Sequence, residues 1–172
     1  MNNMVVDLDL QRLSIPDRFF EYSVSYGNGA KALAEKMASD SDQTTWANAA
    51  VVLMLSAHSV ELFLKGAIFI DNPKADLNHH NIESLFEMYR RIYREEKYYF
   101  NMPFKTEYVC MSEAEIKALE KIKRPTPSVL YRYPAVSGEE VWEGVYGFEA
   151  LSFVPVISQL LEDYCRLRKC FT

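Results

Sequence analysis

The sequence predicts an all-α protein: an up-and-down bundle of four long helices, with one short helix and an irregular insertion rich in Pro and Gly. Stretches whose apolar residues recur at helical spacing make up most of the chain. Polar turns and prolines separate these stretches at short intervals. The composition, with 49% hydrophobic and 25% charged residues, is that of an ordinary globular protein. A chain of 172 residues fits one domain, so we expect a single helical domain over residues 1–172.

The stretch 46–70 is predicted to be the central helix, because it is apolar on nearly every face. A helix that is apolar all round belongs in the middle of a bundle. Thr44 or Thr45 is expected to cap its start. The uninterrupted apolar run 49–55 is shorter than the roughly 20 residues that a membrane span needs. Charged residues then follow that would be costly in lipid, so we expect no membrane insertion.

Two elements precede the central helix. Residues 1–15 alternate weakly between apolar and polar types and are expected to form an extended N-terminal arm. A helix is predicted from Pro16 to about residue 38, because proline suits the first turn of a helix. Gly27 and Gly29 weaken the middle of this helix. They either kink it or allow another backbone to approach closely.

Two further helices are predicted between the central helix and the irregular region. Asn81 is expected to cap a third long helix that ends around residues 98–101. Ser112 and Glu115 then form a capping-box pattern at the start of a short helix. This short helix is predicted to end before Pro125.

The chain from 124 to 147 is the least regular region, with three prolines and three glycines. It is expected to be a loop that contains a short strand or hairpin around 129–133. The last helix is predicted over 148–169. Pro155 falls within it, so this helix either starts near Val154 or is kinked at the proline.

The most informative pattern is a polar stripe on the central helix, formed by His58, Glu61 and Lys65. Their i, i+3, i+7 spacing puts the three side chains on one face of a helix. One interpretation is a solvent-facing edge, because Lys and Glu are seldom fully buried. The other is a polar line that faces a partner element or a site. His80, which precedes the third helix, is a further candidate for that site.

A second candidate lies in the irregular region, where Arg132 stands between two tyrosines, the second of them Tyr133. A carboxylate that faces a helical bundle needs a charged or hydrogen-bonding partner. A guanidinium can bind a carboxylate through two parallel hydrogen bonds. We therefore predict that Glu61 pairs with Arg132, and that this pair marks any functional pocket. The pair is either a structural tie or part of a ligand site.

Charge and cysteine content narrow the functional classes. A net charge of −5 and a pI of about 5.3 argue against a surface that binds polyanions over its whole extent. The basic run Arg90, Arg91 and Arg94 is then either a solvated helix face or a local phosphate site. The three cysteines show no metal-ligand spacing. We therefore expect no metal and no cofactor.

The N-terminus offers no targeting signal. It lacks both a basic region and a long apolar core, so it does not read as a signal peptide. The protein is therefore expected in the cytoplasm.

A family resemblance rests on two neighbouring segments. The stretch SAHSVELFLKGAIF, followed after a short loop by HNIESLFEMY, resembles the HEPN superfamily (higher eukaryotes and prokaryotes nucleotide-binding domain). Members carry a long helix with an ELxLKA-like segment, matched here by residues 61–65, and then a His-containing turn, matched by residues 79–82. Residues 132–134 also resemble a segment in some branches. The resemblance covers about residues 44–98.

The resemblance implies a helical bundle, often dimeric and often found in prokaryotic defence or toxin–antitoxin systems. Many members are metal-independent ribonucleases with an Arg followed four to six residues later by a His. This chain departs from that pattern, because no Arg stands within ten residues before His58, His79 or His80. The leading hypothesis is therefore a non-catalytic, HEPN-like homodimer that binds RNA, a nucleotide or a protein partner such as a nucleotidyltransferase. The alternative is a metal-independent ribonuclease with a non-standard site.

Overall fold

A computed structural model describes residues 5–104, 112–115, 130–133 and 147–171 of the chain. Over these residues the regular structure is entirely helical, which confirms the predicted all-α class. The elements are α1 (Leu8–Gln11), α2 (Ile15–Ser39), the 3₁₀ turn η1 (Ser41–Gln43), α3 (Trp46–Asp71), α4 (Ile82–Ile92), the 3₁₀ turn η2 (Glu96–Tyr98) and α7 (Ala150–Arg168).

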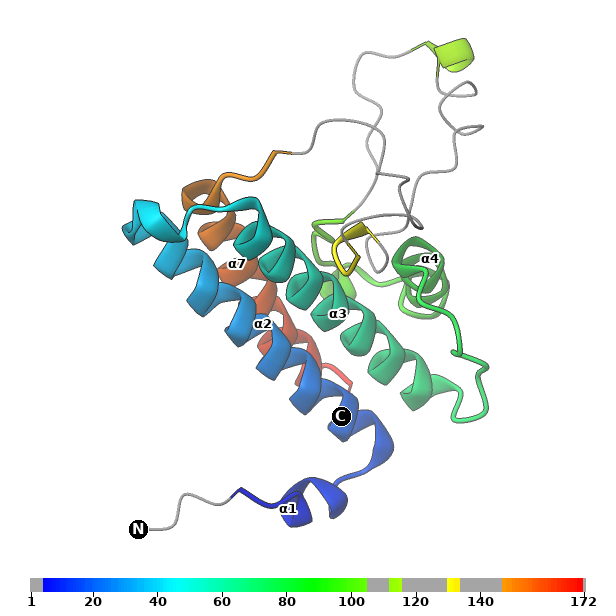
Figure 1. Ribbon diagram of the computed structural model, residues 1–172. Coiled ribbons are helices and arrows are strands. Elements are labelled where there is room, and N and C mark those ends of the chain that lie inside the picture. The colour runs from blue at the N-terminus through cyan, green and yellow to red at the C-terminus, as the bar shows by residue number, and fades with distance from the viewer. Residues whose placement is uncertain (1–4, 105–111, 116–129, 134–146, 172) are drawn as a thin grey trace.

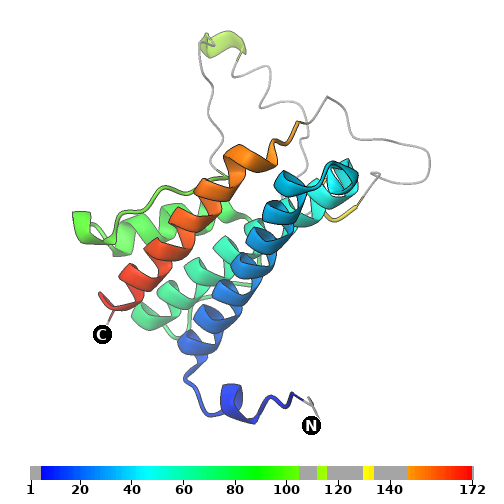
Figure 2. The same ribbon diagram turned by 90° about the vertical axis from the view of Figure 1, so that its left-hand side faces the viewer.

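Three long helices form the body of the bundle. Figure 1 shows α2, α3 and α7 lying side by side, with α2 running opposite to the other two. The shorter α4 crosses α3 at a steep angle, and the two views in Figures 1 and 2 agree on this. α2 is thus antiparallel to both of its long neighbours, α3 and α7, whereas α4 covers one side of α3.

Local sequence signals set most helix starts. The Thr45 side chain accepts a hydrogen bond from the backbone N–H of Asn48, and Asn81 caps α4 through the N–H of Ser84. These bonds satisfy N–H groups that have no partner within the helix. The caps at Thr45 and Asn81 are those that the sequence predicts. α7 is capped instead by the Glu149 carboxylate, which accepts from two backbone N–H groups.

The centre of the core is aromatic. Phe63 on α3 is buried and stacks on Tyr164 of α7, with ring centroids 4.1 Å apart and planes 8° apart. Phe20, Phe100 and Phe171 surround Phe63 at centroid distances of 5.3, 5.8 and 6.2 Å. Because these rings come from four separate parts of the chain, they hold the helices in one arrangement.

The glycines of α2 and α3 mark close approaches between helices. α2 is continuous through Gly27 and Gly29, so the two glycines do not interrupt it. A β-carbon at Gly27 would lie 2.8 Å from Cδ2 of Leu161, and one at Gly66 would lie 3.0 Å from Cβ of Phe19. Such distances are tighter than ordinary carbon contacts, so a larger residue at either position would displace the neighbouring side chain.

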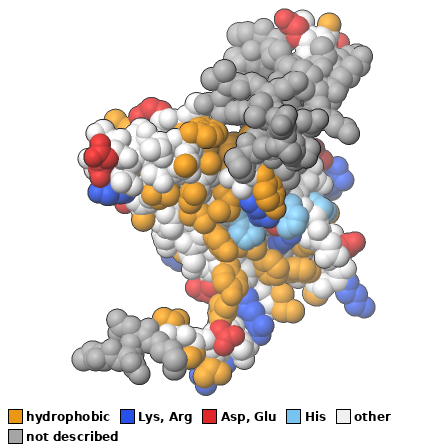
Figure 3. Space-filling view, in the orientation of Figure 1, with side chains coloured by type: hydrophobic (Ala, Val, Ile, Leu, Met, Phe, Trp, Pro, Cys, Tyr) orange, Lys and Arg blue, Asp and Glu red, His pale blue; other side chains and the backbone are white. Residues whose placement is uncertain are grey.

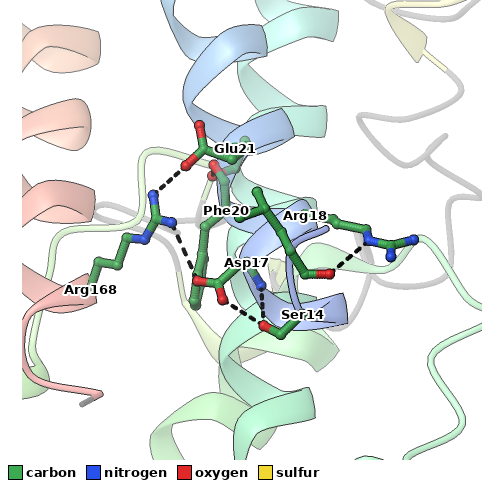
Figure 4. Close-up of polar contacts among 8 residues, drawn as sticks. Ser14, Asp17, Arg18, Phe20, Glu21 and Arg168 are labelled. Carbon is green, nitrogen blue, oxygen red and sulfur yellow. Dashed lines mark hydrogen bonds and ion pairs between the residues drawn. The ribbon is translucent and has the colours of Figure 1, made fainter. Parts of the chain in front are cut away.

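Two ends of the chain meet at an ion-pair network. Arg168 of α7 donates hydrogen bonds to Glu21 at 2.7 Å and to Asp17 at 3.3 Å, both on α2 (Figure 4). Ser14 accepts from the Asp17 N–H as the cap of α2. Hydrogen bonding to Glu21 is the main reason that the pKa of Arg168 lies above its usual value. The network fastens the C-terminal helix to the first turns of α2.

Four predicted boundaries differ from the structure. The arm over residues 1–15 is not extended throughout, because α1 forms a helical turn within it. α4 ends at Ile92, earlier than predicted, and Tyr93 then turns inward to donate to the Ala67 carbonyl at 2.9 Å. α7 begins at Ala150 and includes Pro155, so it does not start near Val154.

The fourth difference concerns the predicted strand near residue 130. Residues 130–132 form a helical turn followed by Tyr133, so the described part of that segment is not a strand. Ser112 and Glu115 form the predicted capping box, with the Ser112 N–H 2.8 Å from the Glu115 carboxylate. The remainder of the predicted short helix and most of the region 124–147 lie outside the described residues.

α3 has the length and apolar composition of a membrane span. In the part of the chain that the structure describes, it is the one such helix, and 72% of its most apolar window is buried inside the bundle. A buried core helix meets the same criteria, so the composition of α3 is explained by its central position.

Candidate functional site

The centre of the candidate site is a buried carboxylate, Glu61, in the middle of α3. Its side chain is almost completely enclosed, with 2% of the residue exposed. The Nζ atom of Lys65 lies 2.8 Å from Oε1 of Glu61, and Nδ1 of His80 lies 2.9 Å from the same oxygen. Lys65 is also buried, whereas more than half of the His80 side chain is exposed. A buried charge is tolerated only with such partners.

Local folding explains how His80 reaches the carboxylate. His80 lies in the segment between α3 and α4, directly before the α4 cap Asn81. The side chains of Leu77 and Ile82, on either side of it, are buried in the core and fix the path of this segment. His79 accepts from the Asn81 N–H in a local turn, and only His80 of the two points to Glu61.

The surroundings of Glu61 keep it ionised. Burial by itself would raise the pKa of Glu61, but the interactions with His58, Lys65 and His80 outweigh burial and lower it to about 2. The carboxylate is therefore charged at neutral pH. Its negative charge holds Lys65 and His80 in place, so that the Lys65 ammonium and Nε2 of His80 can face a ligand.

His58 contacts the other carboxylate oxygen less closely. Its Nδ1 lies 3.6 Å from Oε2 of Glu61, which is an electrostatic contact longer than a good hydrogen bond. That nitrogen is buried and makes no hydrogen bond to the described residues. The ring packs edge-on against Tyr26 of α2, with centroids 4.6 Å apart and planes 86° apart. His58 thus connects the carboxylate to the outer face of α2.

The structure corrects the predicted partner of Glu61. Among the described residues, no ion pair joins Arg132 to Glu61, whose carboxylate is bound by Lys65 and His80. Arg132 instead helps to line a narrow cleft whose walls include His58 and Glu61. The prediction of a direct Glu61–Arg132 pair is therefore wrong, although the two side chains border the same cleft. The nearer partner is Lys65, whose i, i+4 position relative to Glu61 favours an ion pair within one helix.

The polar stripe is covered by neighbouring parts of the chain rather than by open solvent. Glu61 and Lys65 are both buried, which removes the interpretation of the stripe as a solvated helix edge. Tyr133 is exposed at 53% and lies outside the set of described residues that line the cleft. We call His58, Glu61, Lys65, His80 and Arg132 the Glu61 cluster. Its two permanent cations outnumber its one carboxylate, so the cluster favours an anionic ligand.

A pocket of about 600 Å³ opens beside the cluster. Lys65 and His80 form one part of its wall. The rest of the wall consists of aromatic, apolar and polar residues, namely Phe19, Phe69, Ala75, Asp76, Leu77 and Asn78. Its volume is within the range of small-ligand sites. We call it the Lys65–His80 pocket.

Sequence reasoning missed the aromatic and amide part of this pocket. Phe19 and Phe69 come from opposite ends of the sequence of α2 and α3, and their rings meet at 5.4 Å only because the helices are antiparallel. The Asp76 carboxylate accepts from the Asn78 N–H at 3.2 Å in a turn that shapes the rim. The polar composition of the loop after α3 predicted a turn, but no sequence spacing indicated that this loop would lie beside α2.

Histidine and basic side chains gather on the surface near the pocket. Figure 3 shows histidine side chains gathered with Lys and Arg side chains on the side of the molecule where the chain leads from α3 into α4. Asp76 on the rim is exposed, so solvent screens its charge. Among the described residues, no three His, Cys, Asp or Glu side chains are placed to hold a metal ion. The polar groups of the cluster and the pocket wall include imidazole, ammonium, guanidinium and carboxylate groups.

Comparison of the chain with models of known families, with curated proteins and with solved structures found no match.

Proposed function

We propose that this chain is a non-catalytic, HEPN-like helical bundle that binds a phosphate-bearing ligand, RNA or a nucleotide, at the Glu61 cluster. The observation that supports this proposal is the buried Glu61 carboxylate with Lys65 and His80 at 2.8 and 2.9 Å, at the wall of the 600 Å³ pocket. Phosphate oxygens accept hydrogen bonds from ammonium, imidazolium and guanidinium groups. Arg132 adds a second permanent cation at the neighbouring cleft.

The test is a binding titration with labelled single-stranded RNA, with a nucleoside monophosphate and inorganic phosphate as competitors. Arg132→Gln and His80→Gln are expected to weaken RNA binding about tenfold or more, because the first removes a charge-assisted contact and the second removes an imidazole contact. Arg91→Gln is the matched control, since its exposed side chain on α4 pairs with Glu87 away from the cluster. Equal binding by wild type, both site variants and the control would contradict the proposal. If the nucleoside monophosphate displaces the RNA and inorganic phosphate does not, a nucleotide would be identified as the smaller ligand of this site.

A second candidate function is metal-independent RNA cleavage, and the hydrogen bond between His80 and Glu61 favours it. If Nδ1 of His80 donates to Glu61, Nε2 carries the lone pair and can take the proton of a ribose 2′-hydroxyl. The 2′-oxygen then bonds to phosphorus as the bond from phosphorus to the 5′-oxygen breaks, and the leaving 5′-oxygen takes a proton from water. When the binding titration above is carried out with a metal chelator present, the leading proposal predicts that the RNA stays intact. Fragments that appear with wild type and vanish with His80→Ala would favour cleavage.

We further propose that two copies associate through the upper part of the outer α2–α3 face, where α2 ends and α3 begins. Val51 is 41% exposed there, and Leu55 lies 3.8 Å from the position of a β-carbon at Gly29. Figure 3 shows apolar side chains continuing along this face. Exposed apolar patches on otherwise polar surfaces are typical of protein contacts, and two-fold dimers are the commonest assemblies.

Val51→Asp is expected to convert a dimer into a monomer, because it puts a charge into the proposed apolar contact. Light scattering at micromolar concentration measures this change. Leu151→Asp, at an apolar residue of α7 that is 70% exposed, is the matched control and should leave the dimer intact. A wild-type protein that is monomeric at these concentrations would contradict the proposed association.

A further inference from the structure

A second hollow adjoins the Lys65–His80 pocket across one shared side chain. It has a volume of about 520 Å³ and is lined by Ile15, Arg18, Phe19, Tyr22, Tyr26, His58 and Leu62. We call it the tyrosine groove. Phe19 belongs to the walls of both hollows. His58 joins the groove to the Glu61 cluster, because it also lines the cleft that contains Glu61 and Arg132.

The groove offers exposed aromatic surface, mainly the ring of Tyr22. Tyr22 is 49% exposed, and Tyr26 presents its ring beside His58. Apolar side chains of Ile15 and Leu62 border the same space. A planar nucleobase can stack on such a surface. Because every base has a flat π-face, this stacking depends little on which base is present.

The groove is lined by a permanent cation, Arg18, and by a histidine, His58. Arg18 is held in place by hydrogen bonds to the backbone carbonyls of Leu13 at 3.1 Å and Gln11 at 2.6 Å (Figure 4 shows the first). His58 also belongs to the Glu61 cluster. A basic side chain beside aromatic surface suits a single-stranded nucleic acid, because cations bind its backbone phosphates while its bases stack on aromatic rings.

We propose that the tyrosine groove is a nucleobase subsite, so that the ligand is single-stranded RNA that spans both hollows. A phosphate lies against Lys65 and His80, and a neighbouring base stacks on Tyr22. This inference rests on the proposed phosphate-binding function and adds the class of ligand. A mononucleotide would fill the Lys65–His80 pocket alone and leave the groove open.

The test compares a labelled single-stranded RNA with an abasic sugar–phosphate oligomer of the same length. Tyr22→Ala is expected to weaken RNA binding about 5- to 150-fold, the usual effect of losing one stacked base. Binding of the abasic oligomer should be the same for Tyr22→Ala and wild type. Tyr22→Phe retains the ring and should bind RNA within about twofold of wild type. Tyr99→Ala is the matched control, because Tyr99 is 52% exposed and lies outside the groove.

Three results would overturn the inference. RNA affinity unchanged by Tyr22→Ala shows that no base uses the groove. If Tyr22→Ala loses affinity equally for RNA and for the abasic oligomer, the substitution has changed the shape of the protein generally. A change of oligomeric state in Tyr22→Ala, with RNA affinity unaltered, shows that the groove is a contact between copies of the chain.

The outcomes also separate this inference from the proposed function. If Arg132→Gln weakens RNA binding and Tyr22→Ala does not, phosphate binding stands and the base subsite fails. If wild type binds neither RNA nor the abasic oligomer, both fail together.

Discussion

Glu61→Ala is expected to lower the free energy of unfolding by about 3–5 kcal/mol, the usual cost of breaking a buried ion pair. The substitution leaves Lys65 buried without its carboxylate and removes the hydrogen-bond partner of His80. Urea denaturation followed by circular dichroism measures the loss. A shift below about 1 kcal/mol would contradict the geometry described for this pair.

Two controls separate charge from packing at this position. Glu61→Gln keeps the size of the side chain and removes the charge, so it should cost less than Glu61→Ala. The double variant Glu61→Leu with Lys65→Met removes both charges and should recover much of the stability, because an apolar pair no longer needs compensation. A double variant as unstable as Glu61→Ala would show that packing, rather than the uncompensated lysine, decides the effect.

The same carboxylate gives a pH dependence whose sign follows from its lowered pKa. The pKa of Glu61 falls from 4.5 to about 2 on folding, so the folded state favours the charged form. The resulting stability, about 3 kcal/mol at about 1.4 kcal/mol per pKa unit, is present in full above pH 4.5. It is lost as the pH falls from 4.5 toward 2. The difference in stability between wild type and Glu61→Gln should therefore shrink over this interval, and a constant difference would contradict the assignment.

Phe63→Ala is expected to lower the free energy of unfolding by about 3–5 kcal/mol, as large-to-small changes of buried aromatic residues do. Phe63 is 1% exposed and stacks on Tyr164 at 4.1 Å, so its removal opens a cavity between α3 and α7. The neighbouring rings of Phe20 and Phe100 cannot fill that space without moving their own helix or loop. Thermal denaturation, with near-UV circular dichroism for aromatic packing, measures the effect.

Two comparisons check that the loss comes from the cavity. Phe63→Leu retains part of the volume and should cost less than Phe63→Ala. Tyr99→Ala removes an exposed aromatic ring and should change stability by about 0.5 kcal/mol or less. Equal losses for the buried and the exposed positions would contradict the described core.

The sequence by itself determined the elements of this protein, because the signals for helices are local. Thr45, Asn81 and the pair Ser112 and Glu115 cap backbone groups within three residues of themselves. The apolar character of α3 on all faces likewise predicted its central place. The sequence also identified the polar stripe of α3, including Glu61 and Lys65, whose i, i+4 spacing allows them to pair wherever the helix lies.

Only the tertiary structure decided which distant groups meet this stripe. His80 reaches Glu61 because buried neighbours fix the path of the segment before α4, and Arg132 borders the cleft without forming the predicted pair. Phe19 separates the pocket from the tyrosine groove because α2 and α3 pack antiparallel. Spacing along the chain gives the face of a helix on which a residue lies. The partner across that face depends on how loops close and helices pack, and these are set by contacts between residues far apart in the sequence.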